Sequence, residues 1–139
     1  MSLRPFLDAN VLFTAAYNPH GLARVLFDLE RHKALSLLAS RLAIEEARIN
    51  LEIKKPTALD DLANLTETLH LIQIPARPPI ALDLPPKDLT IFSAAVAGKA
   101  THLLTGDKKH FGRYFNKPER TAGITIQTVR EFFEENFDL

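Results

Sequence analysis

The stretch Pro5-Phe6-Leu7-Asp8 places a short apolar run directly before an acidic residue, and late in the chain His102-Leu103-Leu104 is followed by a tight Thr105-Gly106 turn and then by Asp107. Short apolar runs of this kind predict buried strands, because a strand covered on both faces has no polar side to alternate with. Pro5 is compatible with a central strand only as its first residue, since proline donates no ladder hydrogen bond. Each acid is therefore expected just beyond the carboxyl end of a strand.

Apolar residues at helical spacing separate these strands along the chain. Further strands are predicted at 34–39, 71–74 and 124–126, and helices around 22–29, 41–54, 57–69, 88–99 and 129–133. Strands that alternate with helices indicate βαβ units, so the predicted fold is α/β, a three-layer α/β/α sandwich around a central parallel sheet. The proline-rich stretch 75–87 is predicted to be one extended loop inside a single domain spanning 1–139.

The composition excludes several classes of protein. The chain has 139 residues, 46% hydrophobic and 24% charged, as is typical of one globular domain. It has no cysteine, which excludes disulfides, thiolate nucleophiles and cysteine-bound metal, and which is consistent with a cytoplasmic protein. No apolar run approaches the roughly 18 residues of a membrane span, and no secretory signal is expected. The balance of 17 basic and 17 acidic side chains excludes a strongly basic protein but not a local basic patch.

Acidic residues are predicted to gather at one edge of the sheet. Asp8 and Asp107 follow strands, and Asp88 opens the helix before the second of these strands. Ligands of parallel α/β sheets bind outside the carboxyl ends of the strands, so these side chains are expected to share a site. Each acid also has a simpler explanation, because aspartates commonly cap helices or form turns.

A fourth acid is expected from the helix that follows Ser40, where Glu45 and Glu46 are adjacent. At about 100° per residue, Glu46 falls within an apolar stripe and Glu45 on its flank. That stripe consists of Leu42, Ile49 and Ile53. A carboxylate in a buried stripe is costly unless it is paired or coordinated, which favours Glu46. The choice stays open, because a second apolar stripe lies on the opposite side: Ile44, Ala47 and Leu51.

Together these residues resemble the motifs of PIN domains. The acids that match the family pattern, in chain order, are Asp8, Glu46 (or Glu45), Asp88 and Asp107. Asn10 completes an Asp-x-Asn after the first strand, and Asn10 and Thr105 match polar supporting positions. The match extends over essentially the whole chain, and its length suits the stand-alone, VapC-like members. Pro5 and the loop at 75–86 depart from the family pattern.

The resemblance implies a magnesium- or manganese-dependent endoribonuclease whose four acids surround the metal. Hard divalent cations prefer oxygen ligands, and a cation would relieve the repulsion among four carboxylates. The implied partners are an RNA substrate, an antitoxin protein if the chain is the toxin of a toxin–antitoxin pair, and a second copy in a homodimer. The alternative is a catalytically inactive domain of the same fold that binds RNA or protein. A phosphotransfer receiver or a haloacid-dehalogenase-like phosphatase fits poorly, because Asp8 is followed by Asn10 rather than by a second aspartate.

Several basic residues follow directly after Asp107. Lys108, Lys109 and Arg113 are predicted to contact RNA phosphates, since such contacts dominate affinity. The alternative is a solvated loop with its aromatic neighbours, Phe111 and Phe115, in the core. The histidines show no metal-ligand spacing, and His110 is the one that lies near an expected site residue.

Overall fold

The computed structural model describes residues 2–138, in which five parallel strands form one sheet. The strands are β1 (Pro5–Leu7), β2 (Leu38–Ala39), β3 (His70–Leu71), β4 (His102–Leu104) and β5 (Thr125–Gln127). Their order across the sheet is β3-β2-β1-β4-β5, with Phe6 opposite Leu38 on one side and Leu103 on the other. Pro5 is the first residue of the central strand, which is the position where a missing backbone donor is tolerated.

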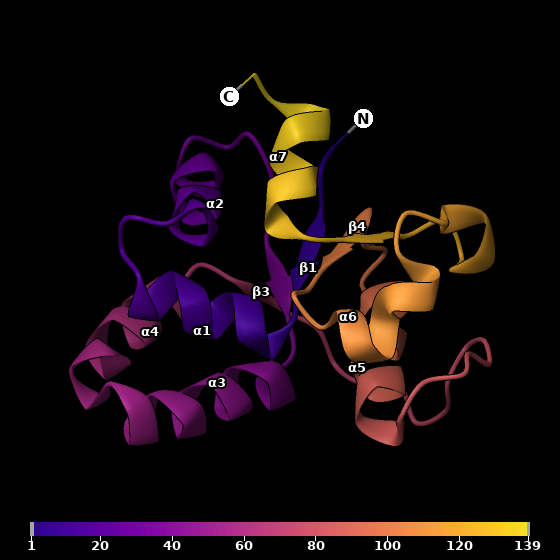
Figure 1. Cartoon of the computed structure of the whole chain (residues 1–139), viewed down its shortest axis with the longest axis horizontal. Coiled ribbons are helices and arrows are strands. Elements are labelled where there is room, and N and C mark those ends of the chain that lie inside the picture. Colours follow the sequence, from indigo (N-terminus) through magenta and orange to yellow (C-terminus); the bar gives the residue numbers. More distant parts are fainter. Residues whose placement is uncertain (1, 139) are drawn as a thin grey trace.

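Helices pack on both faces of this sheet and give the three-layer α/β/α sandwich that the sequence predicts (Figure 1). They are α1 (Ala9–Tyr17), α2 (Leu22–Arg31), α3 (Arg41–Lys54), α4 (Leu59–Thr66), α5 (Pro86–Ala97), α6 (Lys108–Phe111) and α7 (Val129–Asn136). Short 3₁₀ turns occur at η1 (Pro56–Ala58), η2 (Gly112–Tyr114) and η3 (Pro118–Arg120). Helix α1 packs against α2, α3 and α4, whereas α5 lies against β2 and β4.

The predicted elements are mostly present, but several bounds were wrong. The strand expected at 34–39 shrinks to β2, and just before it the backbone N–H of Leu37 donates to the Glu30 carboxylate at 2.9 Å instead of to a neighbouring strand. The strand expected at 71–74 shrinks to β3 at the edge of the sheet, and the helix expected at 57–69 divides into η1 and α4. The extended loop ends at Pro85, since Pro86 starts α5 as a first-turn proline. Helices α1 and α6 were not predicted.

Helix α3 corrects one sequence argument. Its buried stripe consists of Ala43, Ala47 and Leu51, all with no exposed surface. The stripe expected to be buried is exposed instead, with Leu42 at 39%, Ile49 at 45% and Ile53 at 76%. Small alanines let α3 approach α1 closely, so the helix turns its alanines inward rather than its larger apolar residues.

None of the helices in residues 2–138 is long and apolar enough to cross a lipid bilayer.

Candidate functional site

The carboxyl ends of β1 and β4 bring the first and last acidic motifs together. Asp8 follows β1 and caps α1, while Thr105 follows β4, the neighbouring strand. The backbone N–H of Asp8 donates to the Leu104 carbonyl at 3.1 Å, which extends the pairing to the edge itself. Strands β2 and β3 lie on one side of β1 in the sheet, whereas β4 and β5 lie on its other side, so the strand order changes direction between β1 and β4. Ligands of open α/β sheets bind at such a point.

A hydrogen-bond network fixes Asp8 in place. Its Oδ2 accepts from the Thr105 hydroxyl at 2.8 Å and from Asn10 Nδ2 at 3.1 Å, and its Oδ1 accepts from the Ala9 N–H at 2.8 Å. The Thr105 hydroxyl also accepts from the Asp107 N–H at 3.0 Å, and Asn10 Oδ1 accepts from the Gly106 N–H at 2.7 Å. Asn10 and Thr105 therefore connect the loop after β1 to the loop after β4.

Beside this network, the side chains of Asp88, Asp107 and His110 contact one another and connect α5 to α6. Asp88 lies in the first turn of α5, and Asp107 caps α6 by accepting from the His110 N–H at 3.1 Å. His110 Nδ1 is 2.8 Å from Asp107 Oδ2 and 3.1 Å from Asp88 Oδ2. The two carboxylates thus share one imidazole nitrogen between them.

Burial and mutual repulsion perturb two of these acids. Burial raises the pKa of Asp8 above the ordinary aspartate value, and the charge on Asp107 adds to the effect, although hydrogen bonds from Thr105, Ala9 and Asn10 oppose it. Burial also raises the pKa of Asp88; His110 and Lys87 oppose this, while Asp107 and Asp8 add to it. Negative charge is therefore unfavourable here without a compensating cation.

The two glutamates of α3 point in different directions. Glu46 is half-buried, lines the same cavity as the aspartates and forms an ion pair with Lys87. Glu45 is exposed and bonds to Arg48, with 3.0 Å between Oε2 and Nε, and this contact lowers the pKa of Glu45. Glu46 reaches the cavity because α3 is turned by its buried alanines, not because of the apolar stripe used in the sequence argument.

One cavity of about 440 Å³ collects the four acids. Asp8, Glu46, Asp88 and Asp107 line it together with Ala9, Asn10, Phe13, Asn50, Lys54, Pro85, Lys87 and His110. Sequence reasoning did not place Phe13, Asn50 or Lys54 there. The spacing of Glu46, Asn50 and Lys54 at four-residue intervals on α3 is a signal that puts them on one row of the helix.

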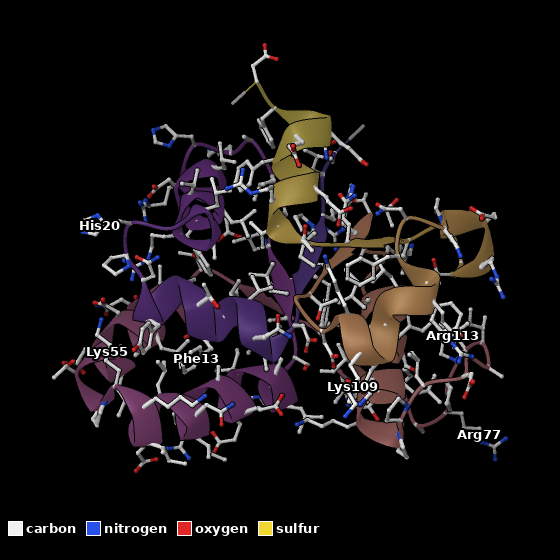
Figure 2. All side chains as sticks on the ribbon, in the orientation of Figure 1. Phe13, His20, Lys55, Arg77, Lys109 and Arg113 are labelled. Carbon is white, nitrogen blue, oxygen red and sulfur yellow. The ribbon has the colours of Figure 1, made fainter. Side chains whose placement is uncertain are left out.

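The basic residues after Asp107 lie outside this lining. Lys108 and Lys109 are exposed on α6, and Arg113 bonds to Asp83, with 2.5 Å between NH1 and Oδ2. Phe111 is fully buried, so it offers no surface to a ligand, whereas Phe115 is only partly buried. Figure 2 shows Lys109 beside α5 and α6, and Arg113 beside the proline-rich loop. Contact of these residues with RNA stays a prediction.

The donor set at the cavity suits a hard divalent cation. Asp88, Asp107 and His110 each offer a ligand atom, and the three atoms lie within 4.8 Å of one another. Asp8 and Glu46 add two further carboxylates to the same cavity. Oxygen-rich sites with open positions are typical of Mg²⁺ or Mn²⁺ rather than of copper or structural zinc.

Comparison with known proteins agrees with this geometry. A family model described as the PIN domain matches residues 4–109. The chain is similar in fold to VapBC2 from Rickettsia felis, solved bound to a DNA fragment from their promoter, with a TM-score of 0.64 and 20% identity over 91% of this chain and 98% of that one. It is also similar to VapBC-1 from nontypeable Haemophilus influenzae, with a TM-score of 0.56 and 18% identity over 92% and 99% of the two chains. No curated protein matches the sequence.

Proposed function

Because the chain belongs to the PIN domain family, we propose that it is a metal-dependent endoribonuclease that hydrolyses phosphodiester bonds of RNA. The observation that carries this proposal is the convergence of four carboxylates from four separate parts of the chain on one cavity. Buried acids with raised pKa values are costly to the fold, so their presence together is better explained by a ligand cation than by stability.

In this proposal Asp8, Glu46, Asp88 and Asp107 hold Mg²⁺ or Mn²⁺. A bound divalent cation lowers the pKa of water and stabilises negative charge on a phosphoryl oxygen. Asn10 and Thr105 act as positioning residues, since their hydrogen bonds leave Asp8 a fixed orientation. Lys87 lines the cavity, and its ammonium group pairs with Glu46.

The proposed hydrolysis uses water as the nucleophile, and none of the side chains at the site has to take that role. The chain has no cysteine. The Thr105 hydroxyl is fully buried and donates a hydrogen bond to Asp8. His110 Nδ1 lies 3.1 Å from Asp88 Oδ2 and 2.8 Å from Asp107 Oδ2, and this contact positions the two carboxylates relative to each other.

We further propose that the chain is a cytoplasmic toxin of a toxin–antitoxin pair. The likeness to VapBC2 and VapBC-1, which covers nearly the full length of those chains, supports this reading. The exposed apolar residues of α3, Leu42, Ile49 and Ile53, support a protein partner, either an antitoxin or a second copy in a homodimer, because aligned apolar surface of this kind usually marks an interface.

The test is hydrolysis of a labelled single-stranded RNA by the purified chain, in chelator and then with Mg²⁺ or Mn²⁺ added. We expect cleavage only with the cation, and a loss of at least a hundredfold in rate in Asp8→Asn, whose fold is checked by its melting temperature. Cleavage that persists in chelator would refute the metal-dependent reaction. RNA binding without cleavage under any condition would instead identify an inactive domain of the same fold.

A further inference from the structure

One end of the cavity carries aromatic and cationic side chains that the proposed reaction does not use. Phe13 and Tyr17 lie four residues apart on α1, and their rings stack with centroids 5.3 Å apart and planes at 25°. Lys54 Nζ lies 5.5 Å from the centroid of Phe13, and Lys55 Nζ lies 5.0 Å from that of Tyr17. Phe13, Tyr17, Lys54 and Lys55 are called the aromatic platform below.

The platform is continuous with the acidic site. Phe13 and Lys54 line the same cavity as Asp8 and Glu46. At a helical rise of 1.5 Å per residue, each four-residue step along α1 or α3 advances about 6 Å. Along α3, the side chains that line the cavity are therefore acidic at Glu46, neutral one step later at Asn50 and basic two steps later at Lys54. Figure 2 shows Phe13 between α1 and α3, with Lys55 further out on the same side.

Core packing accounts for only part of this surface, because Phe13 packs partly against the core and Tyr17 is exposed. Helices α1 and α3 already bury Leu12, Ala47 and Leu51 completely, whereas Tyr17 keeps 44% of its surface exposed and Phe13 is only partly buried. Lys55 Nζ bonds to the Tyr17 carbonyl at 2.8 Å, which holds one cation beside the ring, while Lys54 is exposed. The partly buried ring of Phe13 and the exposed ring of Tyr17, flanked by the two lysines, present aromatic surface and positive charge to solvent.

We propose that the aromatic platform is a nucleotide subsite that holds single-stranded RNA beside the cleaved phosphate. Bases stack on the rings of Phe13 and Tyr17, and Lys54 and Lys55 contact the neighbouring phosphates. Stacking accepts every base, so this subsite gives affinity and position rather than sequence preference. It requires a single strand, because the bases of a duplex are stacked on one another. The inference rests on the proposed ribonuclease function and adds where its substrate lies.

The experiment compares RNA affinity among variants by fluorescence anisotropy, using a labelled single-stranded RNA of mixed sequence in chelator so that the probe survives. Phe13→Leu should weaken binding about tenfold, within the range expected for one lost stacked base, and Phe13→Trp should retain affinity. Phe115→Leu is the matched control, because it makes the same change at another partly buried ring, which follows η2 and does not line the cavity.

A second arm separates stacking from charge. Lys54→Ala should reduce the slope of log affinity against log salt by about 0.7, as expected for one lost contact to a single strand. On an oligonucleotide of the same length without bases, Phe13→Leu and the unmodified chain should bind equally. An equal loss on that probe would overturn the stacking role.

The outcomes also separate this inference from the proposed function. Unchanged RNA affinity in Phe13→Leu, together with a lower melting temperature, would show that the rings only join α1 to α3 and would overturn the subsite. If the unmodified chain cleaves RNA with Mn²⁺ in the same preparation, the ribonuclease proposal survives that result. If the unmodified chain binds no RNA at all, both proposals fail.

Discussion

Replacing Asp88 with asparagine should stabilise the metal-free protein and at the same time remove most of the stabilisation that Mn²⁺ provides. The Asp88 and Asp107 ligand atoms lie within 4.8 Å of each other. The Asp88 side chain keeps only 13% of its surface exposed, so water screens the pair weakly. Asparagine keeps the shape of the side chain and removes its charge, which separates repulsion from packing.

The expected size follows from the separation. Two unit charges 4.8 Å apart repel by about 3.5 kcal/mol at an effective dielectric constant of 20. Because His110 lies between them and some water reaches the cavity, we expect a net gain of about 1 kcal/mol, or ~4 °C in melting temperature. Mn²⁺ at about 100 times its Kd should add about 2.7 kcal/mol to the unmodified chain, or ~10 °C. A Kd weakened about 100-fold in the variant would leave roughly 0.4 kcal/mol of that gain.

The stability gained in Asp88→Asn without metal should also depend on pH, and the raised pKa of Asp88 fixes the direction of that dependence. Since the pKa of Asp88 is raised in the folded state, the folded chain binds more protons than the unfolded chain above the ordinary aspartate value. Its stability is therefore lost as pH rises through the raised pKa. The gain from Asp88→Asn should be small below the ordinary aspartate value and should grow as pH rises.

Scanning calorimetry across this pH range, in chelator and with Mn²⁺, measures both effects. Asp60→Asn is the matched control, because Asp60 is an exposed aspartate in the first turn of α4, as Asp88 is in the first turn of α5. A metal-free Asp88→Asn protein that melts below the unmodified chain would refute the repulsion argument. Equal Mn²⁺ shifts in both proteins would mean that the metal binds elsewhere.

Three other variants test separate parts of the structure. Thr105→Val removes the hydroxyl that donates to Asp8 at 2.8 Å, and should cost about 1–3 kcal/mol in denaturant unfolding and weaken Mn²⁺ binding in calorimetric titration. Neutralising Lys108 and Lys109 should lower the salt slope of RNA binding by about 0.7 per phosphate contact, and an unchanged slope would make them a solvated surface. Thr128→Ala removes the capping box of α7 and should cost about 1 kcal/mol without any change in RNA cleavage.

The positions of Asp8 and Asp107 beyond their strands could be predicted because the rule involved is local. A short apolar run that ends in an acid predicts a buried strand and a polar residue at its carboxyl end, and β1 and β4 follow that rule. Parallel neighbours then bring these ends together without further information. The shortness of β2 was not predictable in this way, because the carboxylate that takes the N–H of Leu37, the residue before β2, comes from Glu30 in another element, α2.

The rotation of α3 shows where a sequence pattern is insufficient. Two apolar stripes compete on this helix, and hydrophobicity favours the larger side chains. The structure buries Ala43 and Ala47 instead, because close helix packing depends on side-chain size as well as on apolar character. Glu46 was chosen over Glu45 on the wrong stripe, although the structure does turn Glu46 toward the cavity. Phe13 was missed because α1, the helix that carries it, was not predicted from the sequence.

The central claim is that a metal-dependent reaction takes place in the acidic cavity, and the adjacent glutamates of α3 test it most directly. Glu46 faces the cavity and Glu45 faces solvent beside Arg48, so Glu46→Gln and Glu45→Gln are the same chemical change one residue apart. The measurement is the rate of Mn²⁺-dependent cleavage of a single-stranded RNA by both variants and by the unmodified chain. We predict a loss of at least a hundredfold in Glu46→Gln and a rate within about twofold of the unmodified chain in Glu45→Gln. Equal rates in the two variants would contradict the assignment of the reaction to this cavity.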